Sequence, residues 1–584
     1  MGYLSRVPRA ESWLRYIVYH PRQIIVLVFL VTLIFALQIP GLRLQTSIYD
    51  LIIEDLPETA QYSAFKEEFG CEEIILVVVK AKGIFQTGTF QKIDQLAKKL
   101  SKIKGVRRVV SLPSIKKAME ISEKWTLSDF ERAISPVDLL QRNFISQDKN
   151  TTVISLILSD VEEKDRVIDT VEELIGQYKE ELTLYQIGMP IVSRALADFT
   201  RQDFIRLPAI TFALIAIILF VFLGNLRGVL IPAGSVIIAL VWTFGLMAWS
   251  GTPLSMLTMI VPIFLIAVGT AYCMYIFPEY LAALKEFDTP QEASLQCFLR
   301  LGFPTSLAVI TTTIGLGSLL INKINAIRQF AVFSCFGILS MLIIILTFLP
   351  AVMALLPFPK NKAERGVRKK ALFSRVLSGI IRINIQHQRI ALTLIAIVAL
   401  LGIIGMSRIR VETNPVDFFK KDTYVAQNFN DIYQDMSGSF PISVALDSHS
   451  SDYFEDPAHL KKIAQLQRFL GSLEGVDKTI SFVDYLKLVN YATNRYKKEL
   501  YALPEEPFEV RMLVNSYKTM LGEDLLKTFM NQDFSKVNIM LRTHISSSKD
   551  FLETQRRIEA YLEKNFPRPF SFQVTGIGVV ISHS

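Results

Sequence analysis

The sequence predicts an α-helical integral membrane bundle with two α+β domains outside the membrane, each a split βαβ, ferredoxin-like sheet. Three observations predict it: long apolar segments, short motifs that recur in one order, and strands that alternate with helices between those segments. Of the 584 residues, 51% are hydrophobic and 20% charged, whereas soluble chains carry about 25% charged residues. A single soluble enzyme domain is therefore not expected.

Seven segments are long enough to cross a hydrocarbon core of ~30 Å, which takes about 20 apolar residues. None has a charged residue or a histidine in its interior, where a charge would cost on the order of 3 kcal/mol. The first could also be a cleaved signal peptide, but the long polar stretch before it favours an uncleaved anchor. The predicted spans are 23–40, 206–223, 228–249, 254–277, 303–321, 329–356 and 390–407.

The basic residues predict the orientation of these spans. Arg6, Arg9, Arg15 and Arg22 precede the first span, and residues 357–389 hold nine lysines and arginines. Loops rich in Lys and Arg stay in the cytoplasm. The chain is therefore expected in a bacterial inner (plasma) membrane, with its N-terminus on the cytoplasmic side. The formal net charge of +8 then reflects topology and lipid headgroups. No nucleic-acid partner is expected, because no aromatic or Gly-rich RNA-binding pattern accompanies the charge.

These assignments divide the chain into seven parts. The first external domain would lie between spans one and two, and the second would follow span seven. The predicted parts are a cytoplasmic interfacial N-terminus (1–22), span one (23–40), the first external domain (41–204), spans two to six (205–356), a basic cytoplasmic linker (357–389), span seven (390–407) and the second external domain (408–584).

Short motifs recur in the same order in the two parts of the chain. The matches pair His20 with His387, Arg43/Thr46/Asp50 with Arg410/Thr413/Asp417, Gly105–Ser111 with Gly475–Ser481, and Gly188 with Gly576. Ordered matches of this kind predict an internal duplication. A second set of five spans would then follow Ser584, so the sequence is expected to be incomplete relative to that architecture.

Each external segment alternates β-branched runs with amphipathic helices, which favours two βαβ units in each. Residues 113–150 and 484–535, between the two units, are expected to be largely helical and polar. The predicted strands of the first segment are Ile74–Val79, Val106–Ser111, Thr151–Leu158 and Leu182–Ile187, with helices at 88–104 and near 163–179. Those of the second are Pro441–Leu446, Val476–Phe482, Lys536–Arg542 and Ser571–Thr575, with helices at 457–471 and 549–564.

The predicted layout resembles that of resistance-nodulation-division (RND) permeases. It consists of one span, a large external domain and five spans, followed by another span and another external domain. The resemblance is to the branch of hydrophobe and lipid exporters that includes the membrane protein large (MMPL) group, and more distantly to sterol-sensing domains. Its most specific residues are Pro262–Tyr272, Pro304–Leu319, Arg328–Gly337 and Leu349–Ala351. The resemblance implies porter-type external domains and secondary-active export of a hydrophobic or lipid-like substrate. Membrane lipids are expected partners, a periplasmic partner or a homo-oligomer is compatible with it, and no cofactor is implied.

The fourth span departs from the pattern of this family. Proton-driven members carry an aspartate in a Gly-x-Gly-x-Asp-Tyr phrase, whereas this chain reads Gly269-Thr270-Ala271-Tyr272 with Ala271 in the place of the acid. A buried carboxylate can hold and release a proton, and an alanine cannot. Thr270 and Tyr272 form hydrogen bonds but store no charge near neutral pH. Either the titratable group lies in the second set of spans expected after Ser584, or the coupling differs or is absent.

Three threonines and several glycines complete the candidate transport or coupling residues. Thr311, Thr312 and Thr313 could line a polar path beside span four, or bond to carbonyls of their own helix. Gly269, Gly315, Gly317 and Gly337 could allow close helix packing or a hinge. The candidates are thus Gly269, Thr270, Ala271, Tyr272, Thr311, Thr312 and Thr313. Trp242 and Trp249 are expected in an aromatic belt at the membrane interface.

No catalytic motif is found, so the chain is not expected to be an enzyme. It lacks a GxxxxGK[ST] loop, an HExxH helix and a GxSxG turn, its six histidines are scattered, and no CxxC pair occurs, so no metal site is expected. Besides a transporter, two functions stay open. One is a non-transporting lipid-sensing receptor or scaffold, and the other is a protein-translocation accessory resembling the SecD/SecF pair.

Overall fold

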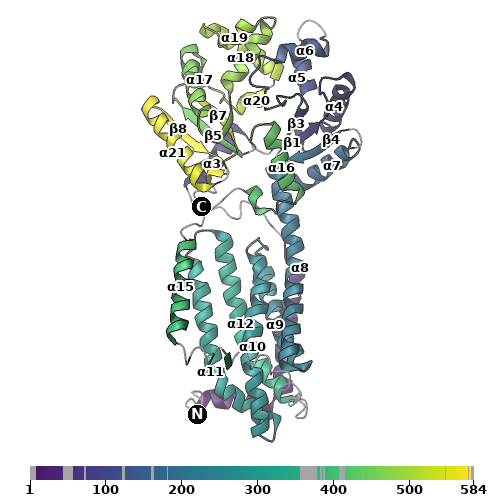
Figure 1. Cartoon of the computed structure of the whole chain (residues 1–584), viewed down its shortest axis with the longest axis vertical. Helices are drawn as coiled ribbons and strands as arrows, with labels where there is room; N and C mark the ends of the chain where they lie inside the picture. Colours follow the sequence, from purple (N-terminus) through teal and green to yellow (C-terminus); the bar gives the residue numbers. More distant parts are fainter. Residues whose placement is uncertain are drawn as a thin grey trace. The chain divides into compact units, whose positions relative to one another are not determined.

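A computed structural model gives the fold of the chain (Figure 1). It divides into a helical unit, Met1–Leu51 with Leu196–Ile409, and an α/β unit, Ile52–Ala195 with Arg410–Ser584. The structure describes residues 8–43, 57–70, 74–120, 125–159, 164–179, 182–355, 378–379, 381, 385, 388–406, 415–438, 440–521, 523–545, 547–576 and 578–580. The basic segment 357–389 lies mostly outside these ranges.

Seven helices of the described chain are long and apolar enough to cross a membrane, which confirms the expectation of a multi-pass helical bundle. The helices overlap the predicted spans but differ from them in their bounds: those of spans 206–223 and 303–321 begin well earlier, at Met189 and Pro290, while that of span 254–277 begins only at Val261. The early turns are polar, so hydropathy alone does not include them. The helices are α2 (Pro21–Ala36), α8 (Met189–Leu223), α9 (Arg227–Trp249), α10 (Val261–Glu286), α11 (Pro290–Gly317), α12 (Asn325–Leu355) and α15 (Gln388–Met406), and the short α1 (Pro8–Tyr19) precedes them.

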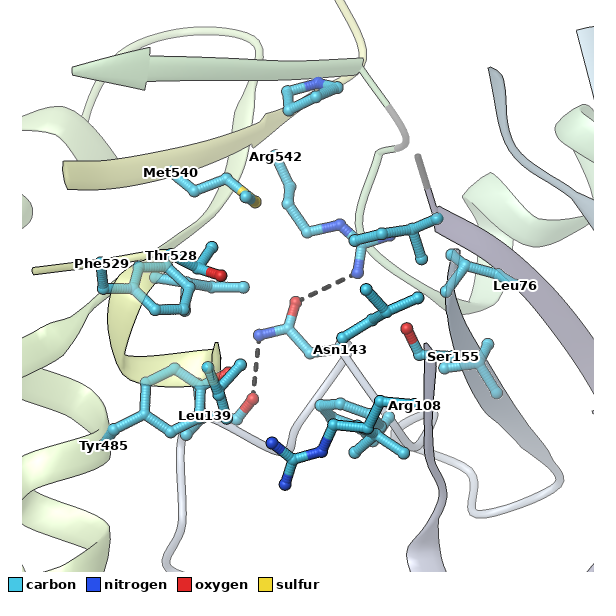
Figure 2. Close-up of a pocket in the computed structure, with 18 of the residues that line it drawn as sticks. Leu76, Arg108, Leu139, Asn143, Ser155, Tyr485, Thr528, Phe529, Met540 and Arg542 are labelled. Carbon is cyan, nitrogen blue, oxygen red and sulfur yellow. Dashed lines mark hydrogen bonds between the residues drawn. The ribbon is translucent and has the colours of Figure 1, made fainter. Parts of the chain in front are cut away.

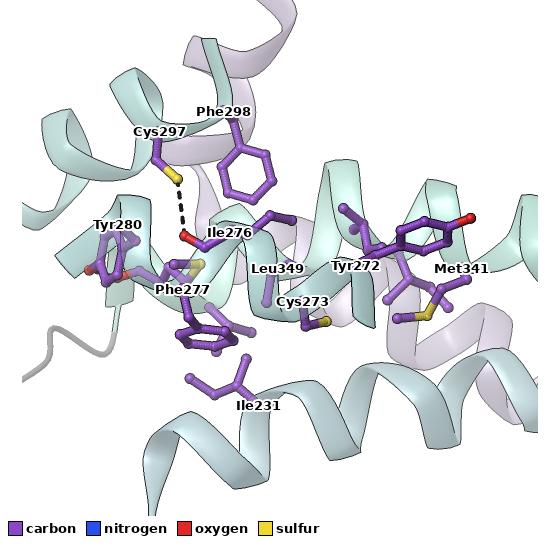
Figure 3. Close-up of a cluster of buried hydrophobic side chains, with 14 of the residues drawn as sticks. Ile231, Tyr272, Cys273, Ile276, Phe277, Tyr280, Cys297, Phe298, Met341 and Leu349 are labelled. Atoms are coloured by element: carbon purple, nitrogen blue, oxygen red, sulfur yellow. Dashed lines mark hydrogen bonds between the residues drawn. The ribbon is translucent and has the colours of Figure 1, made fainter. Parts of the chain in front are cut away.

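Helices α9, α10 and α12 form the centre of the helical unit, since more than half of the apolar stretch of each is buried. Figure 3 shows side chains of this centre, with Phe277 and Tyr280 almost completely enclosed. Hydrogen bonds to backbone carbonyls join the helices: Tyr280 donates to Met353 O at 2.7 Å, and Cys297 donates to Ile276 O at 3.6 Å. Such bonds and close packing hold membrane helices together, because lipid supplies no hydrophobic drive.

The two tryptophans of α9 have different surroundings, which corrects one expectation. Trp249 is 65% exposed, as a membrane-interface residue would be. Trp242 is only 7% exposed, and its indole N–H donates to Thr32 Oγ1 of α2 at 3.0 Å. Trp242 therefore belongs to the packing between α2 and α9, and the prediction of an interfacial Trp242 is wrong.

The α/β unit contains two four-stranded antiparallel sheets with the same strand order, β2-β3-β1-β4 and β6-β7-β5-β8. Both sheets have a register shift near the start of the second strand, after Val106 and after Val476. The strands are β1 (Ile74–Lys80), β2 (Val106–Val110), β3 (Thr151–Leu158), β4 (Thr183–Ile187), β5 (Phe440–Asp447), β6 (Val476–Ser481), β7 (Lys536–Thr543) and β8 (Ser571–Thr575).

Helices connect these strands in the order that the sequence predicts. In β1 the run of Ile, Leu and Val fits a strand that is buried on both faces. The connecting helices are α4 (Thr87–Leu100) and α7 (Lys164–Gly176) in the first half, and α17 (Pro457–Gly471) and α21 (Ser548–Asn565) in the second. The segments between the βαβ units carry α5 (Leu112–Met119), α6 (Leu127–Ile134), α18 (Phe482–Thr493), α19 (Pro507–Leu521) and α20 (Glu523–Lys527).

Two helices pack on the sheet of the other half of the chain. Helix α3 (Pro57–Phe69) precedes the first sheet in sequence but contacts β8 of the second. Helix α16 (Tyr424–Asp435) precedes the second sheet but contacts β4 of the first. We call α3 and α16 the exchange helices. Because each half supplies a helix to the other, the two sheets form a single unit.

Candidate functional site

The predicted phrase in the fourth span lies in α10, with three of its four residues inside the bundle. Gly269 is closely packed: a Cβ atom there would lie 2.9 Å from Val236 Cγ2 and 3.0 Å from Met341 Cε. The Thr270 hydroxyl donates to Ile266 O of its own helix at 2.6 Å. Ala271, in contrast, is exposed on the outer surface of the helical unit.

Tyr272 links this phrase to the three threonines of α11. Its hydroxyl lies 3.1 Å from Thr312 Oγ1, so the structure brings these two candidate residues together. Thr311 and Thr312 both donate to Ala308 O, at 2.9 and 2.8 Å, and Thr313 donates to Val309 O at 2.9 Å. All three threonine hydroxyls therefore bond within their own helix, and only Thr312 among them also meets the phrase in α10.

A second candidate site is a cavity of about 260 Å³ between the two sheets of the α/β unit (Figure 2). Its volume is just below the ~300–1,000 Å³ usual for ligand pockets. Its wall is mostly apolar and comes from both halves of the chain. Among the lining residues are Phe65, Leu76, Ala118, Met119, Leu139, Leu140, Val153, Ile157, Ile480, Tyr485, Leu488, Phe529 and Met540.

The alternation of side chains along a strand explains which residues of β3 and β7 line the cavity. Successive side chains of a strand point to opposite faces. In β3, Val153, Ser155 and Ile157 line the cavity, while in β7 Asn538, Met540 and Arg542 do so. The intervening residues of β7, Val537, Ile539 and Leu541, are completely buried in the sheet's other face. Each sheet thus presents one face to the cavity.

Few polar groups interrupt this apolar wall, and the central one is Arg542. Its guanidinium donates to Gly438 O at 2.9 Å, to Ser437 O at 3.4 Å and to Asn143 Oδ1 at 3.4 Å. Asn143 comes from the first half and donates to Leu139 O at 2.9 Å, as Figure 2 shows. Burial lowers the pKa of Arg542 to about 10, which still leaves it charged at neutral pH.

Further polar residues line the cavity, among them Arg108, Asn538, Ser155 and Thr528. Arg108 of β2 lines its first-half wall and lies below Asn143 in the view of Figure 2. Asn538 of β7 donates to Thr528 O at 3.0 Å, and its Oδ1 is buried without a hydrogen-bond partner among the described residues. The site can therefore offer an apolar volume and two guanidinium groups.

Ion pairs fix the exchange helix α16 to the first sheet. Lys80, the last residue of β1, lies 2.7 Å from Asp431 and 2.8 Å from Asp435. The hydroxyls of Tyr185 and Thr151 donate to the same two carboxylates, at 2.6 and 2.8 Å. Burial alone would raise the pKa of Asp431, but hydrogen bonds from Lys80 and Tyr185 outweigh it and hold that pKa below its usual 3.8.

The other exchange helix has a corresponding ion pair with the second sheet. Glu68, near the end of α3, lies 2.7 Å from Lys536, the first residue of β7. Hydrogen bonding to Glu68 outweighs burial and raises the pKa of Lys536 above 10.5. An acidic side chain close to the end of each exchange helix therefore pairs with a lysine at one end of a central strand in the opposite sheet.

Sequence reasoning did not find the cavity residues, although part of the signal is in the sequence. In Lys536–Thr543 the residues Asn538, Met540 and Arg542 alternate with aliphatic ones, so a charged residue on the less apolar face was visible. Asn143 lies in the loop between α6 and β3, which has no hydrophobic periodicity. No motif in the neighbouring sequence identifies it as a site residue. Among the described residues, no group of three or more His, Cys, Asp and Glu could hold a metal ion.

Comparisons with known proteins found a family model and similar proteins. The model of the MMPL family matches residues 58–383. A membrane protein of Methanocaldococcus jannaschii is 20% identical over 353 residues, which cover 57% of this chain and 90% of that protein. The apo-petrobactin exporter of Bacillus anthracis is 24% identical over 274 residues, which cover 41% of this chain and 36% of the exporter.

Proposed function

We propose, since the chain belongs to the MMPL family, that it is a secondary-active RND-type transporter that exports a hydrophobic or lipid-like substrate across or out of the inner membrane. The seven apolar helices make it a multi-pass membrane protein. The name of the Bacillus relative, an exporter, supports the direction of transport. The observation that carries the proposal is the apolar cavity between the two sheets. A hydrophobic substrate that leaves the membrane needs an apolar site to shield it from water.

The proposed cycle uses the cavity as a resting place for the substrate. Its walls come from both halves of the chain, so a small separation of the halves would open it. The ion pairs Lys80–Asp431 and Glu68–Lys536 oppose that separation, because each joins an exchange helix to the opposite sheet. These partly exposed pairs are weak, about 0–1 kcal/mol each, which suits contacts that must break in every cycle.

The two halves of the α/β unit support a duplicated, ferredoxin-like origin. Both sheets have strand order 4-1-3-2 when read within each half, and a helix connects the first strand to the second and the third to the fourth. We propose that each half is a split βαβ domain and that the motif pairs of the sequence mark a duplication. The equal strand order and the matching register shifts support it.

The orientation proposed for the chain follows from its arginines and lysines. Arg15 and Arg22 precede or begin the first membrane helix, and residues 357–389 carry nine basic residues. Under the positive-inside rule both segments lie in the cytoplasm, and external domains 41–204 and 408–584 lie outside. The cavity would then receive the substrate on the outer side of the membrane.

Energy coupling is proposed to involve the phrase in α10 only indirectly. Ala271 cannot carry a proton, whereas Tyr272 and Thr312 form a hydrogen bond that joins α10 to α11. The close packing of Gly269 against α9 and α12 supports a structural role for that glycine. We therefore propose that Gly269, Tyr272 and Thr312 form a packed contact that transmits motion, and that a titratable group elsewhere drives it.

Filling the cavity tests the export function. Ala118 lines the cavity from α5, and Ala118→Trp would place a large aromatic side chain in it. Cells that lack the gene are expected to retain a hydrophobic compound that the wild type releases, and Ala118→Trp is expected to restore less than a tenth of that release. The measurement is mass spectrometry of cell and medium extracts, with the abundance of the protein checked in membranes.

The matched control is Ala458→Trp, an exposed alanine of α17 in the same unit. It is expected to restore release fully. An unchanged extract profile in cells that lack the gene would argue against export. In that event the lipid-sensing receptor becomes the better reading, since Ala271 at the position of the family's acid already favours a bundle without proton coupling.

A further inference from the structure

The cavity between the two sheets is apolar except for a few polar groups. Arg542 of β7 and Arg108 of β2 contribute the only two guanidinium groups to the wall, among its described residues. They come from different halves of the chain, and Asn143, which bonds Arg542, lies between them in the view of Figure 2. A ligand in the cavity would therefore meet a polar end on an otherwise hydrophobic surface.

The charge of Arg542 is solvated by the protein but not neutralised. Its acceptors are two backbone carbonyls and the amide oxygen of Asn143, all of them uncharged. Asp477 acts on it electrostatically, but the Asp477 carboxylate accepts from Gly438 N at 2.9 Å and lies 3.0 Å from His544 Nδ1. Arg142 adds a like charge nearby. The positive charge at this end of the cavity is thus compensated only in part, by the nearby Asp477 carboxylate.

Arg108 is even less engaged. In the part of the chain that the structure describes, it forms no hydrogen bond and no ion pair, and its charge acts on Tyr485 and Tyr517 from a distance. A partly buried guanidinium without an acceptor is costly, because the side chain gives up water and gains no partner. Arginines with a structural role usually offset this cost by donating hydrogen bonds to a carboxylate or carbonyl. Arg108 has no such acceptor among the described residues, so its guanidinium is available to a ligand.

We infer that the cavity selects an amphipathic anion, whose apolar chain lies between the sheets and whose carboxylate or phosphate head meets Arg108 and Arg542. This inference deepens the proposed export function and rests on it. A charged oxygen acceptor forms the strong, paired hydrogen bonds that guanidinium groups favour, whereas a neutral head forms weaker ones and a cationic head is repelled by the two guanidinium groups. Export would thus apply to acidic lipids and related amphiphiles rather than to neutral hydrocarbons.

Binding of matched probes to the full chain in lipid nanodiscs tests the inference. Dodecanoate and dodecanol share the same apolar chain, and at about pH 8 only the acid is charged. Dodecanoate is expected to bind about tenfold more tightly than dodecanol, the effect of one or two charge-assisted hydrogen bonds. Acetate is expected not to compete, which separates an amphiphile from a free anion as the occupant. Empty nanodiscs give the background.

Substitution of Arg108 locates the effect. Arg108→Gln is expected to remove most of the tenfold preference for dodecanoate and to leave dodecanol binding unchanged. Arg107→Gln is the matched control, because Arg107 is the exposed neighbour in β2 and does not line the cavity. Arg542→Lys, which keeps the charge, is expected to retain a larger preference than Arg542→Gln.

The possible outcomes separate the inference from the proposed function. Equal binding of dodecanoate and dodecanol to the wild type would overturn the anionic preference but leave a cavity that holds apolar chains. A preference that survives in both Arg108→Gln and Arg542→Gln would overturn the role of the two arginines. Binding of neither probe above the empty nanodiscs would overturn the inference together with the cavity as a substrate site.

Discussion

Replacing Gly188 or Gly576 by alanine is expected to destabilise the α/β unit by about 3 kcal/mol in each case. Gly188 follows β4 with φ +138°, and Gly576 follows β8 with φ +145°. A Cβ atom at these positions would lie 2.4 Å from Ile74 O and 2.6 Å from Pro441 O. Both carbonyls belong to central strands and cannot easily move, so backbone strain adds to the clash.

Hydrogen exchange of the full chain, read by mass spectrometry, resolves this effect by region. Gly188→Ala is expected to speed exchange in β1 and β4, and Gly576→Ala in β5 and β8. Gly88→Ala is the control, because Gly88 lies in helix α4 with open space around it, and alanine there should be neutral or stabilising by up to ~1 kcal/mol. Unchanged protection in both variants would show that the close approaches do not hold the sheets.

Gly337→Leu is expected to destabilise the helical unit by about 2 kcal/mol, because it overpacks the contact of α12 with α9 and α10. A Cβ atom at Gly337 would lie 2.6 Å from Leu265 Cδ1 and 2.9 Å from Thr243 Oγ1. Both neighbours are buried in the bundle, and the Thr243 hydroxyl is already bonded to Ala239 O at 2.7 Å. Neither can move away without disturbing a second helix.

A thiol-reactive dye can follow this change during heating of the purified protein. Cys273 and Cys297 are buried in the helical unit, so their labelling reports opening of the bundle. Gly337→Leu should lower the temperature of labelling, while Gly315→Leu should leave it unchanged, since nothing lies within 4 Å of a Cβ atom at Gly315. Equal labelling temperatures for the two variants would mean that Gly337 is not a packing contact.

The sequence contains enough local information to predict the strands and spans. Runs such as Thr151–Leu158 and Ser571–Thr575 are strands with the predicted bounds, because β-branched and aliphatic residues flanked by polar turns favour extended structure. Helix α17 also has its predicted bounds, with Asp456 as N-cap. The apolar spans follow from length and hydropathy alone, since lipid requires a helix at such a segment.

Packing between distant segments could not be predicted in the same way. Helix α3 contacts β8 and helix α16 contacts β4, each in the sheet of the other half of the chain. The hydropathy pattern of a helix does not indicate which of the two sheets it packs on. Trp242 was expected at the interface because its type favours that region, but its indole N–H found Thr32 inside the bundle. Tertiary partners of this kind override the preference of a residue type.

The candidate site shows the same limit. The phrase Gly269–Tyr272 was found because it matches a pattern, and the structure adds that Ala271 is exposed while Tyr272 meets Thr312. The cavity has no motif, since its wall combines alternate residues of strands far apart in sequence. Only the fold brings Arg108 and Arg542 to one cavity.

The claim that the cavity between the sheets holds the exported molecule can be tested by photo-cross-linking in living cells. Benzoylphenylalanine in place of Phe529, which already places an aromatic ring in the cavity wall, should give adducts of lipid-like mass on irradiation, identified by mass spectrometry of the purified protein. The same amino acid in place of the exposed Ala458 should give none. Adducts of equal yield at both positions, or at neither, would contradict the proposed role of the cavity.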